Sequence, residues 1–289
     1  MKTLTITGVP EHFNFPWTTL IPTQPLTDLS IQLKWVEESR GSGKMLEALD
    51  EGETDVAIVL TESFFKKYES DPSIKILGLF VQSPLNWGIH ISPKSTVSDL
   101  SLILEPKFLI SRKGSGSELM ARVLADREKW NSEKLEFEIV NNLPGALDRM
   151  QNHGNEMFLW EKFTTKPHVD SGEMIRIGEV ASPWPCFVVI AKEDTIRSHQ
   201  EALIRLMDLV YQTNSHISED PKTPQLIAEN YELPLEDVLK WISETKWNLN
   251  SEISRVEMQD ALAKMKHFGI LKDLPILENT CAAGFVKFV

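Results

Sequence analysis

Two glycine- and serine-rich stretches have the composition of anion-binding loops. Residues 111–117 read SRKGSGS, and residues 40–43 read RGSG. Glycine lets the backbone approach a ligand closely, and serine places a hydroxyl beside the N–H groups that the start of a helix leaves free. Both stretches therefore indicate loops that can hold a small anion. The alternative interpretation is that Ser115 and Ser42 only cap the helices that follow.

Known nucleotide-binding patterns fit neither stretch. A Walker A loop ends in Gly-Lys-Ser/Thr, but Gly43-Lys44 is followed by Met45. A dinucleotide fingerprint needs a third Gly or Ala at the places where Leu46 and Leu119 stand. A flexible linker is also excluded, because the flanking residues have regular helix and strand periodicity.

Other side chains whose functional groups could take part in binding or catalysis stand where strands are expected to end or to connect the halves of the chain. The segment 8–17, GVPEHFNFPW, carries more proline, histidine and aromatic residues than a simple turn needs, and glutamates follow two apolar runs. The residues in question are His12, Trp17, Thr61, Glu62, Trp87, Trp160, Glu161 and Trp184. The alternatives are a surface loop for the histidine, helix capping for the glutamates and core packing for the tryptophans.

The elements that must position these side chains alternate between strand and helix. Apolar strand patterns cover residues 3–8, 31–37 and 55–60, and a helix pattern covers residues 44–52. This order is typical of a parallel sheet. In such sheets ligands bind beyond the carboxyl ends of the strands, where both Gly-Ser stretches are expected to lie.

The same order then recurs, with strands at 107–111, 135–140 and 156–160 and helices at 117–130 and 144–154. Two segments also have similar amino-acid sequences. ALDEGETDVAIVLTE (48–62) and ALDRMQNHGNEMFLWE (146–161) both run from Ala-Leu-Asp through a turn and an apolar strand to a glutamate. Shared order, spacing and ending together predict a duplicated lobe.

Two apolar segments, 77–92 and 184–192, are expected to carry the chain between the lobes, and helices alone follow, at about 197–216, 222–230, 235–245 and 255–267. We therefore predict lobe 1 from residues 1–88 plus 189–289, and lobe 2 from residues 89–188. A discontinuous lobe around an inserted one implies a hinge and a cleft.

The composition is that of a globular protein with an acidic charge. The 289 residues are 42% hydrophobic and 25% charged, and the net charge of −12 argues against nucleic acid or an anionic membrane as the main partner. Two cysteines give neither a disulfide framework nor a cysteine metal site. No apolar run reaches the ~18 residues of a membrane span, and none near the N-terminus matches a signal peptide. We expect a cytoplasmic protein, or a periplasmic one if a leader was removed.

The order of elements and several segments of the sequence resemble a known family. The order of elements resembles the type 2 periplasmic-binding-protein fold of ABC-transporter solute-binding proteins. The phrases GVPEHFNFPW, GSGKMLEALDEGETDVAIVLTE, SPLNWGIHI and ISRKGSGSELMARVLA resemble its non-secreted Candida albicans Ca3427-like subgroup, which is related to the thiamine-pyrimidine synthase branch. The resemblance spans nearly the whole chain. It implies an α/β fold of two lobes, with two hinge-crossing strands and a C-terminal helical tail on lobe 1.

The resemblance also implies where a ligand is held. In such proteins the ligand lies between the lobes, in contact with the loops after strands one and two, the crossing strands and the start of the second lobe's first helix. Carried over residue by residue, the ligand-binding positions are Pro10, His12, Trp17, Gly41, Ser42, Gly43, Thr61, Glu62, Asn86, Trp87, Ser111, Arg112, Ser115, Gly116, Ser117, Trp160, Glu161 and Trp184.

The leading hypothesis is a non-catalytic solute-binding protein for a small polar or anionic metabolite. Helix N–H groups and Arg112 would supply charge-assisted hydrogen bonds, and aromatic side chains would supply apolar cover. We expect no catalytic residue, no cofactor and no metal, and a small-molecule ligand as the partner; the oligomeric state is left open.

Two alternatives stand beside it. The first is a cytoplasmic enzyme acting on a small, thiamine-precursor-like metabolite, with His12 as base and Glu62 or Glu161 as acid. The synthases of the related branch use a cysteine-rich iron-binding segment and a lysine-held pyridoxal phosphate, and the missing cysteine cluster argues against that reaction. The second is the sensor domain of a regulator, which would need a partner to bind DNA because no helix-turn-helix segment precedes the lobes.

Overall fold

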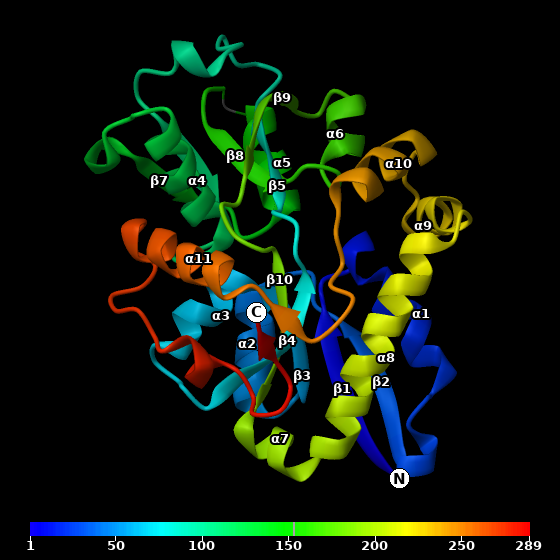
Figure 1. Cartoon of the computed structure of the whole chain (residues 1–289). Coiled ribbons are helices and arrows are strands. Elements are labelled where there is room, and N and C mark those ends of the chain that lie inside the picture. Colours follow the sequence, from blue (N-terminus) through cyan, green and yellow to red (C-terminus); the bar gives the residue numbers. More distant parts are fainter. Residues whose placement is uncertain (153) are drawn as a thin grey trace. The chain divides into compact units, whose positions relative to one another are not determined.

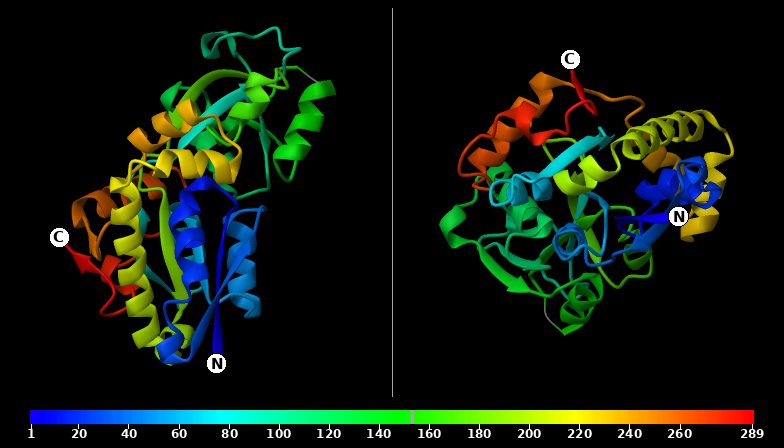
Figure 2. Two further views of the ribbon diagram at one scale, coloured as in Figure 1. Left: turned by 90° about the vertical axis from the view of Figure 1, so that its right-hand side faces the viewer. Right: turned by 90° about the horizontal axis from the view of Figure 1, so that it is seen from below.

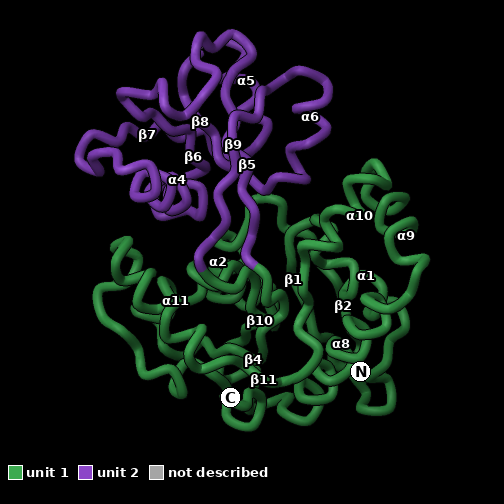
Figure 3. The backbone as a smooth tube through the Cα atoms, turned by 45° about the horizontal axis from the view of Figure 1, so that its top comes forward, with its two compact units in different colours: residues 1–83, 184–289 green, residues 84–183 purple. Residues whose placement is uncertain are grey.

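The chain folds into two compact units, which we describe separately. The computed structural model describes residues 1–152 and 154–289. Unit 1 comprises residues 1–83 and 184–289, and unit 2 comprises residues 84–183 (Figure 3). The predicted helix 144–154 includes residue 153, which lies outside the described residues.

Unit 1 is built on a five-stranded sheet with the order β2-β1-β3-β10-β4 (Figure 1). Strands β1, β2 and β3 pair in parallel, whereas β10 is antiparallel to both β3 and β4. The sheet is therefore mixed, and the parallel arrangement predicted from the sequence holds only for its first three strands. The bounds are β1 Lys2–Gly8, β2 Ile31–Glu37, β3 Val56–Leu60, β4 Ile74–Val81 and β10 Phe187–Lys192.

Helices cover this sheet because their apolar side chains bury against it. In α2 the residues Met45, Leu46 and Leu49 are buried on one face, and Gly52 ends the helix in a left-handed conformation with φ 72°. Helix α1 lies beside the long helix α8 (Figure 2). The bounds are α1 Phe15–Leu20, α2 Ser42–Glu51, α3 Thr61–Tyr68, α7 Glu193–Ser198, α8 Gln200–Glu219, α9 Thr223–Tyr231, α10 Leu235–Glu244 and α11 Arg255–His267.

The C-terminal part of unit 1 differs from the helix-only tail that the sequence predicts. Short strands β11 (Glu252–Ile253) and β12 (Lys287–Phe288) pair in parallel, and single bridges join Ile76 to Cys281 and Val81 to Trp247. The tail therefore hydrogen-bonds to the edge strand β4 as well as packing on the sheet. Strands of two residues carry too little periodicity to be seen in a sequence.

Unit 2 repeats the strand order of unit 1. Its sheet runs β7-β6-β8-β5-β9, with β6 parallel to β7 and β8, and β5 antiparallel to β8 and β9. In each sheet the antiparallel strand, β10 or β5, is the first strand after a crossing. The bounds are β5 Asn86–Ile91, β6 Lys107–Ile110, β7 Glu136–Ile139, β8 Met157–Glu161, β9 Ile175–Ala181, α4 Gly116–Arg127, α5 Leu143–Asn152 and α6 Lys166–Asp170.

The unit boundaries fall at 83/84 and 183/184, whereas the sequence places the lobe boundaries at 88/89 and 188/189. The physical reason is the hydrogen-bond pairing of the strands that follow each crossing. Strand β5 belongs wholly to the sheet of unit 2, and β10 belongs wholly to the sheet of unit 1. The connections therefore precede these strands instead of running through them.

Short 3-10 helices complete the described backbone, at His12–Asn14, Ile21–Thr23, Thr27–Leu29, Leu100–Leu102, Ser132–Lys134 and Leu277–Thr280. Across residues 1–152 and 154–289, none of the helices combines the length with the apolar character that crossing a bilayer requires.

Candidate functional site

In unit 1, three segments meet at the carboxyl ends of the parallel strands. The Ser42 hydroxyl oxygen accepts a hydrogen bond from the Leu60 N–H at 3.0 Å, which ties the start of α2 to the end of β3. The Thr61 N–H donates to the Cys186 carbonyl at 3.0 Å, next to the crossing. We call Gly41, Ser42, Thr61, Glu62 and Trp184 the unit 1 strand-end cluster.

The start of α2 is shaped by glycine rather than by a serine cap. Gly41 is the N-cap residue, has φ 81° and makes no side-chain capping bond. That φ lies in the left-handed region that glycine adopts without strain. Ser42 is the first residue of the helix, so the interpretation of Ser42 as a cap is wrong. Gly43 follows in the first turn and is half-buried.

Glu62 is a buried carboxyl group in the first turn of α3. It is 4% exposed, and the Trp184 indole N–H donates to its Oε2 at 2.8 Å. Burial raises the pKa of Glu62 to about 7, although the backbone N–H of Glu62 and the Trp184 indole act in the opposite direction. The carboxyl group is therefore poised between its neutral and charged forms near neutral pH.

Two further features define the polarity of this cluster. The hydroxyl of Thr61, which is 0% exposed, has no hydrogen-bond partner among the described residues. Arg40 pairs with Glu38 through bonds of 2.8 and 2.6 Å, and Lys44 pairs with Glu47. The positive charges of Arg40 and Lys44 are thus each paired with a carboxylate.

The three predicted residues of the loop after β1 and of α1 differ in their burial. Pro10 is exposed, but His12 is 2% exposed and packs edge to face against Trp241, with ring centroids 4.2 Å apart. Burial lowers the pKa of His12 to about 3, so its ring is neutral. Trp17 is fully buried beside Phe80 and is a core residue. The positions of His12 and Trp17 match the packing interpretation better than contact with a ligand.

In unit 2, three buried serines form a chain of hydroxyl groups at the start of α4. We call Ser111, Ser115 and Ser117 the serine cluster. The Ser117 oxygen accepts a bond from the Ser111 N–H at 3.0 Å and lies 2.9 Å from the Ser115 oxygen and 3.3 Å from that of Ser111. The Ser115 oxygen also accepts from the Glu118 N–H at 3.3 Å, which makes Ser115 the helix cap.

The capping interpretation of Ser115 is therefore confirmed. It does not exhaust the cluster, because the two bonds among the three hydroxyl groups use two of their protons and leave the third to donate. Gly116 is the first residue of α4 and is half-buried, as is Arg112 in the loop before it. The Gly114 N–H is occupied by the Glu118 carboxylate at 2.7 Å.

The remaining predicted residues of unit 2 lie on β5 and β8. Asn86 and Trp87 begin β5, and Trp87 pairs across the sheet with Glu161. Trp87 is 5% exposed, and its indole N–H has no partner among the described residues. Trp160 is half-buried and stacks on Phe158, with ring centroids 5.3 Å apart.

Glu161 is a second buried carboxyl group, but its bonds serve the local loop. Its Oε2 accepts from the Phe163 N–H at 2.9 Å, the Thr164 N–H at 2.6 Å and the Thr164 hydroxyl at 2.9 Å. Burial raises the pKa of Glu161, and these bonds oppose that shift. Glu62 and Glu161 thus share a position at equivalent strand ends but differ in what they bind.

One polar network was missed by the sequence interpretation. His90 lies in β5 with 0% exposure, its Nδ1 3.1 Å from the Phe158 carbonyl and its Nε2 2.9 Å from the Thr165 hydroxyl. Since the carbonyl only accepts, Nδ1 carries the proton and Nε2 accepts from Thr165. Burial lowers the pKa of His90 to about 3, with a contribution from Arg176 on β9. The sequence placed His90 only within the apolar segment 77–92, and nothing in the sequence connects it to Thr165.

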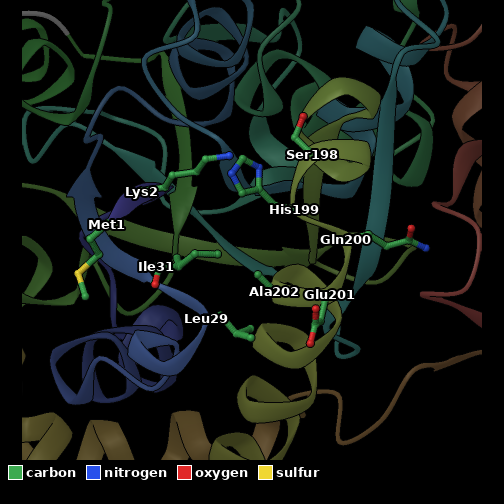
Figure 4. A pocket seen from close by; sticks show the side chains of 10 residues that line it. Met1, Lys2, Leu29, Ile31, Ser198, His199, Gln200, Glu201 and Ala202 are labelled. Carbon is green, nitrogen blue, oxygen red and sulfur yellow. The ribbon is translucent and has the colours of Figure 1, made fainter.

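A pocket of about 350 Å³ lies elsewhere in unit 1 (Figure 4). It is lined by Met1, Lys2, residues 29–31 and residues 198–202, which are the amino ends of β1 and β2 and the start of α8. In Figure 4 the end of the Lys2 side chain lies beside the His199 ring. None of the predicted site residues lines this pocket. Within residues 1–152 and 154–289, no three or more His, Cys, Asp or Glu side chains are grouped as metal ligands would be.

Comparisons with known proteins identify a family model and solved structures that are similar to this chain. The family model described as Ca3427-like PBP matches residues 87–180. No curated protein matches the chain. Among solved structures, the Candida albicans CA3427 gene product, which exhibits the generic periplasmic-binding-protein fold, has a TM-score of 0.87 and 23% identity. That match covers 98% of this chain and 96% of the other.

Two bacterial binding proteins also share the fold. The alkanesulfonate-binding protein SsuA from Xanthomonas axonopodis pv. citri, bound to MOPS, has a TM-score of 0.74 and 13% identity, covering 100% of this chain and 99% of the other. The nitrate-binding protein NrtA from Synechocystis PCC 6803 has a TM-score of 0.69 and 12% identity, covering 97% and 84%. The predicted α/β type 2 periplasmic-binding-protein fold is confirmed, as is the resemblance to the Ca3427-like group.

Proposed function

We propose that this Ca3427-like chain, whose fold is that of the type 2 periplasmic-binding proteins, is a non-catalytic binding protein for a small polar or anionic metabolite. The ligand groups on which this proposal rests are those of unit 2, the serine cluster with Arg112.

The serine cluster is the observation that carries the proposal. Three hydroxyl groups and the first N–H groups of a 12-residue helix come together at the carboxyl end of β6. Hydroxyl and N–H donors at a helix start favour an anion, because the helix dipole is positive there. Arg112 in the same loop can add a charge-assisted, two-pronged hydrogen bond.

The solved relatives support the ligand class. Two proteins with this fold are described as binding an alkanesulfonate and nitrate, both of which are small anions. The serine cluster offers the kind of neutral donors that hold such anions without a metal.

The environment of His12 favours binding over the enzymatic alternative. A general base must reach the proton that it abstracts. His12 is 2% exposed and is enclosed by Phe13 and Trp241. That enclosure accounts for His12 as a packing residue of unit 1.

Binding and turnover can be separated by one experiment. Native mass spectrometry of the purified protein should show a bound small molecule, and isothermal titration with ethanesulfonate, nitrate and inorganic phosphate should give saturable binding of at least one of them. Ser117→Ala should weaken that binding, because it removes the central hydroxyl of the serine cluster. Ser132→Ala, an exposed serine of the same unit, is the matched control. Steady consumption of the bound molecule, abolished by His12→Ala, would contradict the proposal in favour of the enzyme.

A further inference from the structure

The pocket at the amino ends of β1 and β2 has a lining that suits a ligand of its own. Lys2 and Ile31 are the first residues of these strands, and residues 198–202 surround the start of α8. We call this pocket of about 350 Å³ the amino-end pocket (Figure 4). Because β1, β2 and β3 are parallel, it lies at the opposite edge of the sheet from the unit 1 strand-end cluster. It shares no residue with that cluster or with the serine cluster.

Lys2 brings a positive charge to this pocket that no carboxylate balances. Other basic residues near the start of α8 differ, because Arg197 pairs with Asp194 and Arg205 pairs with Asp28. Lys2 forms no such ion pair with any residue that the structure describes. The chain has a net charge of −12, so acidic partners are plentiful in its sequence. The charge of Lys2 is nevertheless left available to a ligand.

His199 adds a ring whose hydrogen-bonding capacity the protein does not use fully. Its Nδ1 atom is buried and has no hydrogen-bond partner among the described residues. Buried polar atoms in folded proteins nearly always have a partner, so a ligand group that bonds to the ring would remove an energetic cost. His199 is also the N-cap residue of the 20-residue helix α8 and makes no side-chain capping bond. The N–H groups of residues 200–202 therefore lack the side-chain acceptor that often satisfies the start of a helix.

These groups share the ability to donate hydrogen bonds, which favours an anion. A lysine ammonium has three N–H donors, a histidine ring has one or two, and the N–H groups at a helix start attract anions. Glu201 is the only acidic residue of the lining, and in Figure 4 its carboxyl group points away from Lys2 and His199. A phosphoryl group has three acceptor oxygens, so it can accept from the ammonium, the ring and the helix start at the same time.

We propose that the amino-end pocket binds phosphate, either as the inorganic ion or as the phosphoryl group of a small phosphomonoester, with Lys2 and His199 as the side chains that hold it. The pocket volume falls within the roughly 300–1,000 Å³ of small-molecule sites, so an organic part has room beside the phosphoryl group. This site is separate from the proposed binding function of unit 2 and does not depend on it.

A phosphate titration of the full chain, followed by ¹H–¹⁵N NMR, tests the proposal residue by residue. Inorganic phosphate and glycerol 3-phosphate are the probes, and sodium chloride keeps the ionic strength constant. The backbone amide signals of residues 200–202 should shift and saturate with at least one probe. Tighter binding of glycerol 3-phosphate would identify a phosphomonoester as the ligand class, and equal or tighter binding of inorganic phosphate would identify the free ion.

Two variants remove the proposed contacts, and two others are controls. Lys2→Met removes the ammonium and should weaken this binding about tenfold, the magnitude of one hydrogen bond to a charged group. His199→Phe keeps a ring but removes both nitrogens, and a similar loss is expected. Lys34→Met removes an exposed lysine from the neighbouring strand β2, and its affinity should stay within about twofold of the wild type because salt screens distant charges. Ser117→Ala, in unit 2, should leave the shifts of residues 200–202 unchanged.

Four results would overturn the proposal. They are the absence of a saturable shift at residues 200–202 with both probes, unchanged affinity in Lys2→Met or in His199→Phe, an equal loss in Lys2→Met and Lys34→Met, and loss of the shifts in Ser117→Ala. The first three leave the proposed function standing, because binding at the serine cluster is measured separately by isothermal titration of Ser117→Ala and Ser132→Ala. The fourth would mean that the shifts report phosphate bound at the serine cluster.

Discussion

The buried carboxyl of Glu62 makes the stability of unit 1 depend on pH in a direction opposite to that of most carboxylates. Its pKa rises from the ordinary 4.5 to about 7 in the folded chain. The folded state therefore keeps a proton that the unfolded state has already lost between these two values. Stability from this group is complete below pH 4.5 and is lost as the pH rises through about 7.

The size of the effect follows from the shift. A change of about 2.5 pKa units corresponds to about 3 kcal/mol, of which about 2.5 kcal/mol falls between about pH 5 and about pH 8. Glu62→Gln removes the titration, while the amide oxygen still accepts the Trp184 N–H. We therefore expect Glu62→Gln to gain about 2.5 kcal/mol relative to the wild type over that range.

Urea unfolding of both proteins at the two pH values, followed by circular dichroism, measures this difference. Glu51→Gln, which removes an exposed carboxylate from the same unit and keeps Glu62, should follow the pH dependence of the wild type. If the difference in unfolding free energy between the wild type and Glu62→Gln stays constant with pH, the reasoning is refuted. Glu62 would then have the same pKa in the folded and unfolded states.

Three other predictions concern single contacts. Arg112→Ala should weaken alkanesulfonate binding by about 1.5–3 kcal/mol in isothermal titration with little effect on stability; unchanged affinity would remove Arg112 from the site. Gly88→Ala would place a Cβ 2.4 Å from Cε1 and 2.5 Å from Nε2 of His90, so thermal unfolding should show a loss of about 1–3 kcal/mol; a variant as stable as the wild type would show that the His90 ring moves aside freely. Trp184→Phe removes the indole donor, so the pKa of Glu62 should rise above about 7 in a ¹³C NMR titration of labelled glutamate; a lower value would show that burial does not dominate.

The sequence identified the strands with dense apolar runs and missed the elements that lack them. Strand β3 is apolar throughout and buried at every position except its last, so its pattern is unmistakable. Strand β9, an edge strand with the sequence IRIGEVA, is mostly exposed or half-buried and shows no clear alternation. Helix α3 begins directly after β3 with no turn residue between them, so the sequence contains no signal for its start.

The candidate site was predictable in its location but not in its contacts. The rule that functional loops follow the carboxyl ends of parallel strands located the loops of Gly41 and Ser115. The bond between Glu62 and Trp184 spans 122 residues and depends on β10 entering the sheet of unit 1 between β3 and β4. Sequence spacing contains no information about such a pairing.

The place of β10 in that sheet also has a consequence for the order in which the chain folds during synthesis. Unit 2 is continuous in sequence, so all five of its strands have emerged once residue 181 has left the ribosome. Strands β3 and β4 emerge much earlier, but β10, which must lie between them, ends only at residue 192. Until then β3 presents an unpaired edge to the cell. The first half of unit 1 is thus synthesised before unit 2, but its sheet is completed only after unit 2 has emerged, and its edge is open to chaperones or to mispairing in the meantime.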